Sequence, residues 1–411
     1  MKEYILENNL KLIYKHTESE LTSICISINA GAGVETEKYG IAHVTEHMVY
    51  KGTKNRTEKE INEELSNIFG FNNAMTNYPY VIYYGTLLGK DLKKGVDLLN
   101  DIILNPSFSD DGFKEEMNVI KEELEEWDEE LEQYCEDKLF FNSFNSRRIK
   151  YPIIGTKESL ENMTLNDIRE FYSKYYFPEN TSIVVISSVR FDKVKDIVCE
   201  YFEKWNLAYN KKDDRNELNC KSIEYEISKI DIFNDKRDGI KACKVEIVCP
   251  IDELTENEIK ALRIFNQYFG EGVNSILYDT LRTKNALIYD VITKIAHENY
   301  IKLYKITFST AEENVNKSIA LVKGCIERLE LLVEHIDKKQ REQLIKNFKL
   351  KRLFREEQSI VLAKELATYD TMFGDYKIYI NEVNELDLLT NEMIFEVGNR
   401  VLKNLSIQII D

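Results

Sequence analysis

Near its start the chain reads His43-Val44-Thr45-Glu46-His47, and these are two of only five histidines, four residues apart. On an α-helix, residues i and i+4 lie on one face, so both imidazole rings can reach a single metal ion. Glu46 falls on the same face beside the two histidines, where its carboxylate can hold a water molecule. The pattern therefore predicts a helical metal site. The alternative is a half-buried helix face with two histidines and a solvated glutamate.

A long acidic helix predicted over residues 111–130 offers a third ligand. The apolar side of this helix comprises Phe113, Met117, Val119, Ile120, Leu124 and Trp127. At about 100° per residue, Glu116 and Glu123 share that side, whereas Glu115 and Glu122 point away from it. Two buried carboxylates need a partner, and a metal ion with its histidines would supply one; a salt bridge is the alternative. We therefore expect Glu123 to be the third ligand and Glu116 to lie just behind the ligands.

Composition limits the class of protein. The 411 residues favour two domains, and 43% hydrophobic with 31% charged residues is typical of a soluble globular protein. A formal net charge of −17 argues against a nucleic-acid partner. The chain shows neither a signal-peptide pattern nor an apolar run of membrane-spanning length, so we expect a cytoplasmic protein with no membrane partner. The seven cysteines form no C-x-x-C pair, and neither disulfides nor thiolate metal sites are expected.

The order of predicted elements repeats along the chain. Strands followed by helices fill residues 1–208, a polar segment over 209–222 reads as a linker, and strands followed by helices fill residues 223–411. This predicts a duplicated α+β unit. Within the first half, strands are expected at Phe71–Thr76 and Val81–Thr86, joined by a hairpin turn. H-x-x-E-H occurs only in the first half, so any metal belongs there.

With these motifs assembled, the chain resembles the pitrilysin/insulinase family of zinc peptidases, especially the half-length branch that contains the mitochondrial processing peptidases. Gly40–Thr53 matches the metal helix of that family, and Glu116 with Glu123 matches its distal acidic motif. Asn73-Ala74-Met75-Thr76 matches an N-A-x-T edge strand. Arg282 and Tyr289 match a C-terminal pair, although Ala286 stands between them where the family usually has glycine.

The resemblance implies two homologous α/β-sandwich domains, each an antiparallel-rich sheet covered by helices, that together form half of a clamshell chamber. It implies Zn²⁺ held by His43, His47 and Glu123, with Glu46 as the catalytic base. It also implies that Asn73, Ala74, Met75 and Thr76 align a peptide substrate by strand addition, and that Arg282 and Tyr289 grip the peptide near the scissile bond. The expected activity is zinc-dependent cleavage of unfolded or short peptides.

Alternatives stay open for the assembly and for single residues. The chain could act in a homodimer, or in a heterodimer with a related half-length chain that processes a precursor peptide in a biosynthetic pathway. It could also be a non-catalytic scaffold, against which the intact metal motif argues. Without the resemblance, Asn73 could be only a strand-end cap or turn residue, and Arg282 could do no more than complement a helix dipole. A tyrosine on an alternating strand, such as Tyr289, is more often a core residue than a catalytic one.

Overall fold

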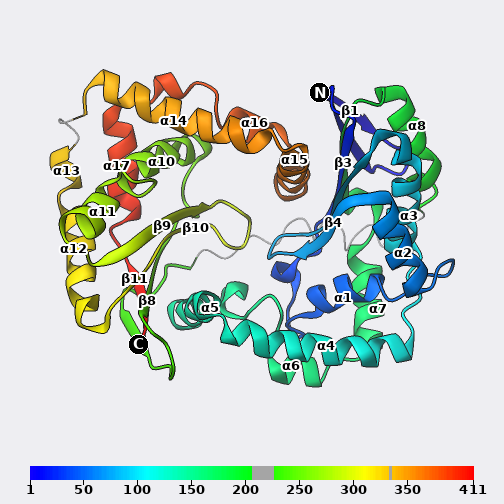
Figure 1. Ribbon diagram of the computed structural model, residues 1–411, viewed down its shortest axis with the longest axis horizontal. Coiled ribbons are helices and arrows are strands. Elements are labelled where there is room, and N and C mark those ends of the chain that lie inside the picture. Colours follow the sequence, from blue (N-terminus) through cyan, green and yellow to red (C-terminus); the bar gives the residue numbers. More distant parts are fainter. Residues whose placement is uncertain (206–225, 333–335) are drawn as a thin grey trace. The chain divides into compact units, whose positions relative to one another are not determined.

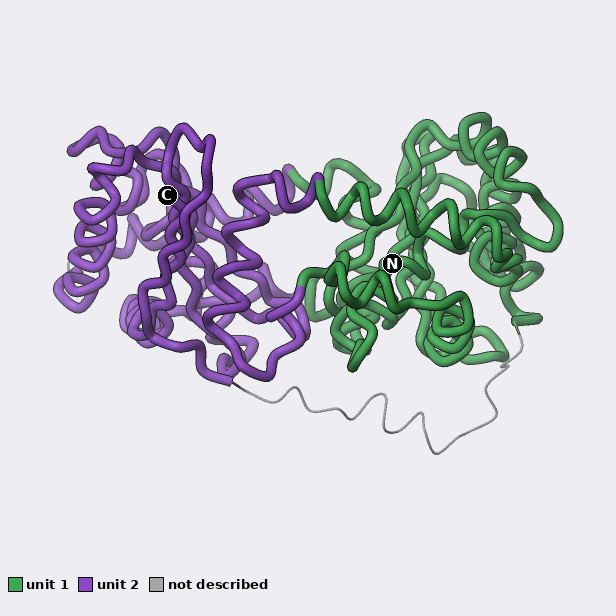
Figure 2. Tube along the Cα trace, turned by 90° about the horizontal axis from the view of Figure 1, so that it is seen from below, with its two compact units in different colours: residues 1–125, 152–223, 355–380 green, residues 126–151, 224–354, 381–411 purple. Residues whose placement is uncertain are grey.

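The computed structural model describes residues 1–205, 226–332 and 336–411 (Figure 1). The predicted linker 209–222 lies outside the described residues, as do Cys220 and His335. The described chain forms two compact units (Figure 2), and each contains one β-sheet covered by helices. The predicted α+β fold class, with two sheets covered by helices, is confirmed.

The two units are not the two contiguous halves of the chain. Unit 1 comprises residues 1–125, 152–223 and 355–380, and unit 2 comprises residues 126–151, 224–354 and 381–411. The predicted domains, 1–208 and 223–411, therefore differ from the units in two segments. Residues 126–151 of the first half belong to unit 2, and residues 355–380 of the second half belong to unit 1. The first segment carries a helix that packs on the sheet of unit 2, and the second carries a helix that packs on the sheet of unit 1.

The sheet of unit 1 has six strands in the order β1-β2-β6-β3-β5-β4. Its strands are β1 (Lys2–Ile5), β2 (Lys11–His16), β3 (Leu21–Ile28), β4 (Phe69–Thr76), β5 (Val81–Leu88) and β6 (Thr181–Ser187). All neighbours are antiparallel except β2 and β6. The hairpin that joins β4 to β5 confirms the predicted turn, and β4 lies at one edge of the sheet.

Helix α15 (Ser359–Phe373) covers one face of this sheet. Its Leu362 and Leu366 are buried in a cluster with apolar side chains of the central strands, among them Cys25 and Ile82. Helix α3 (Leu92–Leu104) contacts β5 of the same sheet, and helix α8 (Phe191–Phe202) contacts β2. Unit 1 also contains the α-helices α1 (Ile41–Val49), α2 (Glu58–Ile68), α6 (Lys157–Glu161) and α7 (Leu165–Tyr175), and most of α4 (Asp110–Glu129) and α16 (Lys377–Asn381).

The sheet of unit 2 has five strands in the order β7-β11-β8-β10-β9. Its strands are β7 (Ile232–Asp235), β8 (Cys243–Pro250), β9 (Ile288–Ala296), β10 (Leu303–Thr310) and β11 (Ser406–Ile410). One face carries alternating apolar residues that form a single buried core with the helices above it. Those helices are α10 (Glu256–Phe269), α11 (Ile276–Tyr278), α12 (Val315–Glu327), α13 (Leu329–Leu332), α14 (Lys338–Glu356) and α17 (Asn391–Val401).

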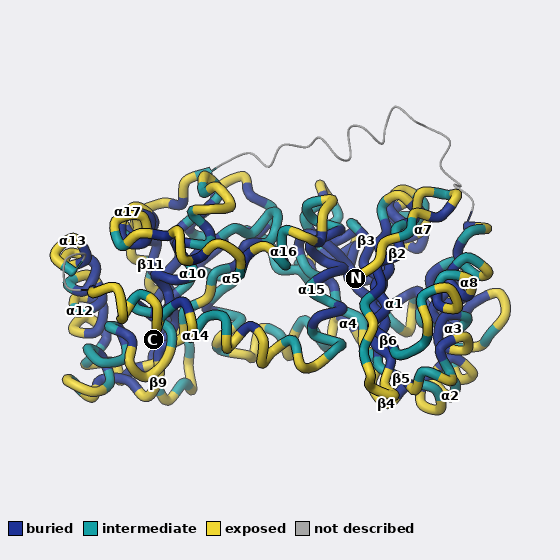
Figure 3. Tube along the Cα trace, turned by 90° about the horizontal axis from the view of Figure 1, so that it is seen from above, coloured by how far each residue is buried: buried dark blue, intermediate teal, exposed yellow. Residues whose placement is uncertain are grey.

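On the other face of this sheet, β8 and β11 carry buried polar side chains, and α5 (Leu131–Ser143) covers them. Lys244 pairs with Glu132 at 3.2 Å, and Lys305 pairs with Glu136 and with Glu246. Most residues of the central strands of both sheets are buried and appear dark blue in Figure 3. The layer beneath α5 is held together by ion pairs and a hydrogen bond between Asn142 and Gln408. Burial of the charged groups is tolerated because each meets a partner of opposite charge.

Two expectations from composition can be checked against the described residues. The six cysteines in the described ranges are all free, as expected. No helix within those ranges is both long enough and apolar enough to cross a membrane.

Candidate metal centre

Helix α1 carries the H-x-x-E-H motif, and its start is fixed by a glycine and a buried carboxylate. Gly40 has φ +92°, a left-handed conformation, and an added Cβ would lie 2.4 Å from the carbonyl oxygen of Ile154. Glu35 accepts hydrogen bonds from the backbone N–H groups of Gly40 at 3.0 Å and Ala42 at 2.9 Å. These N–H groups have no partner within the helix, so the carboxylate satisfies them and complements the helix dipole.

The two histidines and Glu123 converge as the sequence predicts. The Nε2 atoms of His43 and His47 lie 3.2 Å apart. Each Nε2 lies 3.7 Å from an oxygen of Glu123, and one ligand atom from each residue falls within 4.8 Å of the others. Bonds of about 2.1 Å to a tetrahedral ion would place two ligand nitrogens about 3.4 Å apart. The donor set and its spacing therefore fit a zinc ion.

Helix α4 presents its glutamates as the wheel predicts. The side chain of Glu116 is 12% exposed and that of Glu123 is 37% exposed, whereas that of Glu115 is 71% exposed. Glu122 is also exposed. Val119 differs from expectation, because it is 49% exposed rather than buried.

Glu116 lies behind a ligand rather than among the ligands. Its Oε1 lies 2.8 Å from Nδ1 of His47, the ring nitrogen opposite the one that faces His43. A carboxylate in this position fixes the histidine ring and its tautomer, leaving Nε2 free to bind a metal. Burial alone would lower the pKa of His47, but the hydrogen bond to Glu116 and the nearby carboxylates raise it above its usual value. By contrast, burial lowers the pKa of His43 to about 3, which favours the neutral form that binds a metal.

Glu46 lies in a buried position on the same helix and is held by the edge strand β4. Its side chain is largely buried, and Thr76 donates a hydrogen bond from Oγ1 to Oε2 of Glu46 at 3.1 Å. Burial raises the pKa of Glu46 to about 7, with the positive charge of His47 acting in the opposite direction. A carboxyl group tuned in this way can accept and release a proton near neutral pH.

Two family models match this chain. The model described as "Insulinase (Peptidase family M16)" matches residues 11–157, and the one described as "Peptidase M16 inactive domain" matches residues 162–348. The chain belongs to the insulinase family, M16. The first match contains the whole His43, His47 and Glu123 group, and the second contains Arg282 and Tyr289.

Relatives in the M16 family support the same assignment. The Bacillus subtilis protein named "Uncharacterized zinc protease YmxG" is 26% identical over 306 residues, which cover 73% of this chain and 71% of the relative. A zinc protease of Rickettsia bellii is 24% identical over 97% of this chain and 94% of its own length. The β subunit of the mitochondrial-processing peptidase of Dictyostelium discoideum is 28% identical over 51% of this chain and 45% of its own length.

Solved structures share the M16 fold. A protease from Helicobacter pylori superposes with a TM-score of 0.84 at 21% identity, covering 100% of this chain and 99% of that one. A structure from Pseudomonas fluorescens, described as a peptidase M16 inactive domain, superposes with a TM-score of 0.85 at 15% identity, covering 100% of this chain and 97% of that one. At these identities the likeness establishes the fold.

The residues of the predicted N-A-x-T edge-strand motif lie along β4. Asn73 is exposed, and its Oδ1 accepts a hydrogen bond from the backbone N–H of Ala74 at 2.9 Å. Ala74 and Met75 are half-buried, and Thr76 is buried against Glu46. Among the described residues, β4 pairs only with β5, so its other side offers backbone donors and acceptors. The role of these residues in binding substrate stays a prediction.

Arg282 and Tyr289 lie in unit 2, in a π-helical turn (Asp279–Lys284) and in the edge strand β9. The two side chains meet, with the guanidinium carbon 5.7 Å from the centre of the tyrosine ring, and Tyr289 is 85% exposed. Because its side chain is exposed, Tyr289 is not a core residue of unit 2. Ala286, between them, has φ +51°, a left-handed conformation that glycine adopts without strain. A glycine at this position would therefore relieve backbone strain.

Two residues of the site are not predicted from the sequence. Glu35 caps α1, and Lys51 follows α1 and lies 3.3 Å from Glu116. Glu35 precedes the helix by several residues, so its contact with the start of α1 depends on the path of the intervening loop. A contact between Lys51 and a helix more than sixty residues away leaves no local pattern in the sequence.

Proposed function

We propose that this chain is a zinc-dependent endopeptidase that cleaves short or unfolded peptides. The convergence of His43, His47 and Glu123 beside a buried Glu46 carries the proposal. A bound Zn²⁺ supplies Lewis-acid chemistry, in which a carbonyl oxygen is polarised and a water molecule becomes more acidic.

Glu46 would act as the proton carrier. Thr76 donates to Oε2, so we assign Oε1 as the atom that accepts a proton from the attacking water. The same carboxyl group would then deliver that proton to the nitrogen of the leaving amine as the peptide bond breaks. The hydrogen bond from Thr76 holds the carboxylate in one orientation through both transfers. Glu116 holds the ring of His47 while this occurs.

Substrate selection would follow from β4. An extended peptide could add to the open edge of this strand through backbone hydrogen bonds, with Asn73 and Ala74 beside it. Folded proteins seldom offer a free extended segment, so this mode of binding favours unfolded or short peptides. The acidic balance of the chain would favour peptides with basic residues near the site.

A mixed peptide library tests the activity directly. The zinc-loaded chain should cut peptides internally, and mass spectrometry should locate the cleavage sites. Chelation should stop cleavage and added Zn²⁺ should restore it, while a stably folded protein in the same tube stays intact. A chain that binds one zinc ion yet cuts no peptide in the library would contradict the proposal and favour the scaffold alternative.

We also propose that the working enzyme contains two chains, with Arg282 and Tyr289 of one chain acting on a peptide bound at the zinc site of the other. The support is chemical: one chain carries both the metal group and an Arg–Tyr pair whose tyrosine is exposed, so a homodimer can supply every part. We also propose a cytoplasmic location, as expected from the sequence.

Mixing two inactive variants tests the assembly. Glu46→Gln and the double variant Arg282→Ala/Tyr289→Phe should each be inactive alone. After subunit exchange, mixed dimers should recover up to about a quarter of wild-type activity, because half of the dimers are mixed and each holds one intact composite site. A monomeric active enzyme by sedimentation, or no recovery after proven exchange, contradicts the homodimer. Activity only with a second half-length chain would support the precursor-processing heterodimer.

A further inference from the structure

We propose that Lys51 is a positioning residue that sets the zinc affinity of the centre through Glu116. The inference rests on the zinc site of the proposed function, but not on its peptidase chemistry. Its chain of contacts runs from Lys51 to Glu116 and from Glu116 to His47, and each step is a polar contact between half-buried or buried side chains.

Lys51 stands just beyond the last turn of α1. Its backbone N–H bonds to the carbonyl oxygen of Met48 at 3.3 Å, so its place follows directly from the helix that carries both histidines. The side chain is only 13% exposed, and Nζ lies among three carboxylates. They are Glu58 at 2.9 Å, Glu116 at 3.3 Å and Glu115 at 3.6 Å.

Glu116 divides its two oxygens between the ligand and the lysine. Oε1 lies 2.8 Å from Nδ1 of His47, and Oε2 lies 3.3 Å from Nζ of Lys51. A carboxylate held at both oxygens keeps one orientation, and that orientation points the lone pairs of Oε1 at the imidazole N–H.

Loss of the lysine should therefore loosen the carboxylate and weaken the metal site. Changes to a residue hydrogen-bonded to a ligand histidine typically cost about 10–100-fold in metal affinity. Lys51 acts one contact further away, so we expect the lower end of this range, about 10-fold.

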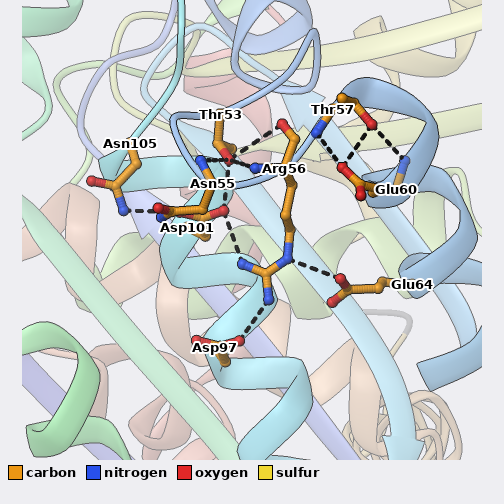
Figure 4. Close-up of polar contacts among 9 residues, drawn as sticks. All are labelled: Thr53, Asn55, Arg56, Thr57, Glu60, Glu64, Asp97, Asp101 and Asn105. Carbon is orange, nitrogen blue, oxygen red and sulfur yellow. Dashed lines mark hydrogen bonds and ion pairs between the residues drawn. The ribbon is translucent and has the colours of Figure 1, made fainter.

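A purely structural role is the competing explanation, since Lys51 also ties the end of α1 to Glu58 in α2. The following loop has, however, a separate anchor (Figure 4). Asp101 accepts hydrogen bonds from Thr53 Oγ1 at 2.6 Å and from Arg56 at 2.9 Å, and Arg56 also bonds Asp97 at 2.7 Å and Glu64 at 3.0 Å. The loop can thus keep its fold without the lysine.

The test compares zinc dissociation constants, measured by competition with a chromophoric chelator, with urea unfolding of the same samples. Lys51→Met should bind zinc about 10-fold more weakly, and Lys51→Arg, which keeps the charge, should stay within about 3-fold of wild type. In a Glu116→Gln background, Lys51→Met should have no further effect on zinc affinity, because the residue through which it acts is gone. The visible spectrum of bound Co²⁺ should change in Lys51→Met and not in Lys51→Arg.

Two controls separate the explanations. Glu58→Gln removes the tie to α2 and leaves Glu116 untouched, and Asp101→Asn weakens the loop anchor; both should lower stability without lowering zinc affinity. Equal zinc loss in Glu58→Gln, or an undiminished effect of Lys51→Met in the Glu116→Gln background, overturns the inference.

Should Lys51→Met not fold, Lys51→Gln takes its place in every comparison. A wild-type chain that binds no zinc overturns the proposed function as well, whereas tight wild-type binding with unchanged affinity in Lys51→Met overturns only this inference.

Discussion

Glu46→Gln is expected to retain about one zinc ion per chain and to lose peptide hydrolysis by about 10³-fold or more. The amide has the same shape as the carboxylate, and its oxygen can still accept the hydrogen bond from Thr76. It cannot accept the proton of a water molecule at neutral pH. Because the metal ligands are untouched, the loss should appear in turnover and not in metal content. Zinc is measured by atomic absorption, and hydrolysis with a peptide found in the library.

Thr76→Val serves as the matched variant for this measurement. It removes the donor to Glu46 but leaves the carboxylate, so we expect zinc content to stay normal and turnover to fall by a smaller factor, about 10-fold. Wild-type rates in Glu46→Gln would show that another group carries the proton, and the mechanism proposed for Glu46 would be wrong.

The second large effect is expected for Glu123. Glu123→Gln should weaken zinc binding by more than about 100-fold and abolish hydrolysis, since even residues behind the ligands are worth up to that factor. Glu123 lies 3.7 Å from the Nε2 atoms of both histidines, and an amide oxygen without charge binds Zn²⁺ far less well.

Glu122→Gln is the control for Glu123→Gln, because it makes the same chemical change one residue earlier on α4. Glu122 is exposed and points away from the metal group, so zinc affinity and hydrolysis should stay within about 2-fold of wild type. Comparable zinc loss in both variants would show that the face of α4 assigned to the site is wrong.

Much of the candidate site could be predicted because its signals are local and periodic. The i, i+4 spacing of His43 and His47 requires a helix, and a wheel is enough to separate Glu116 and Glu123 from their neighbours. The wheel places Val119 on the buried side of α4, but its side chain is exposed. The apolar character of a residue does not show that another residue packs against it. The contacts of Thr76 and Lys51 with the site's glutamates depend on tertiary packing and leave no spacing pattern.

The fold class was predictable for the same reason, whereas the assignment of helices to units was not. Helix α5 packs on a charged sheet face through Glu132 and Glu136, so it lacks the apolar stripe by which a packed helix is recognised. Helix α15 has apolar residues, but nothing in its sequence shows which of the two sheets it covers. A division of the chain at a polar linker therefore separates each of these helices from its sheet.

Because α5 and α15 each cover the sheet of the unit that the rest of their half does not form, neither half of the chain is expected to fold well when it is expressed alone. Expressed alone, residues 1–208 would lack α15 and expose Cys25, Ile82 and their apolar neighbours, a surface that promotes aggregation. Expressed alone, residues 223–411 would lack α5 and expose Lys244, Glu246 and Lys305, which water can hydrate. Neither half therefore contains all the helices that cover its sheet. A chain shortened to residues 1–208 would lose α15, the helix that covers the sheet of the metal-binding half.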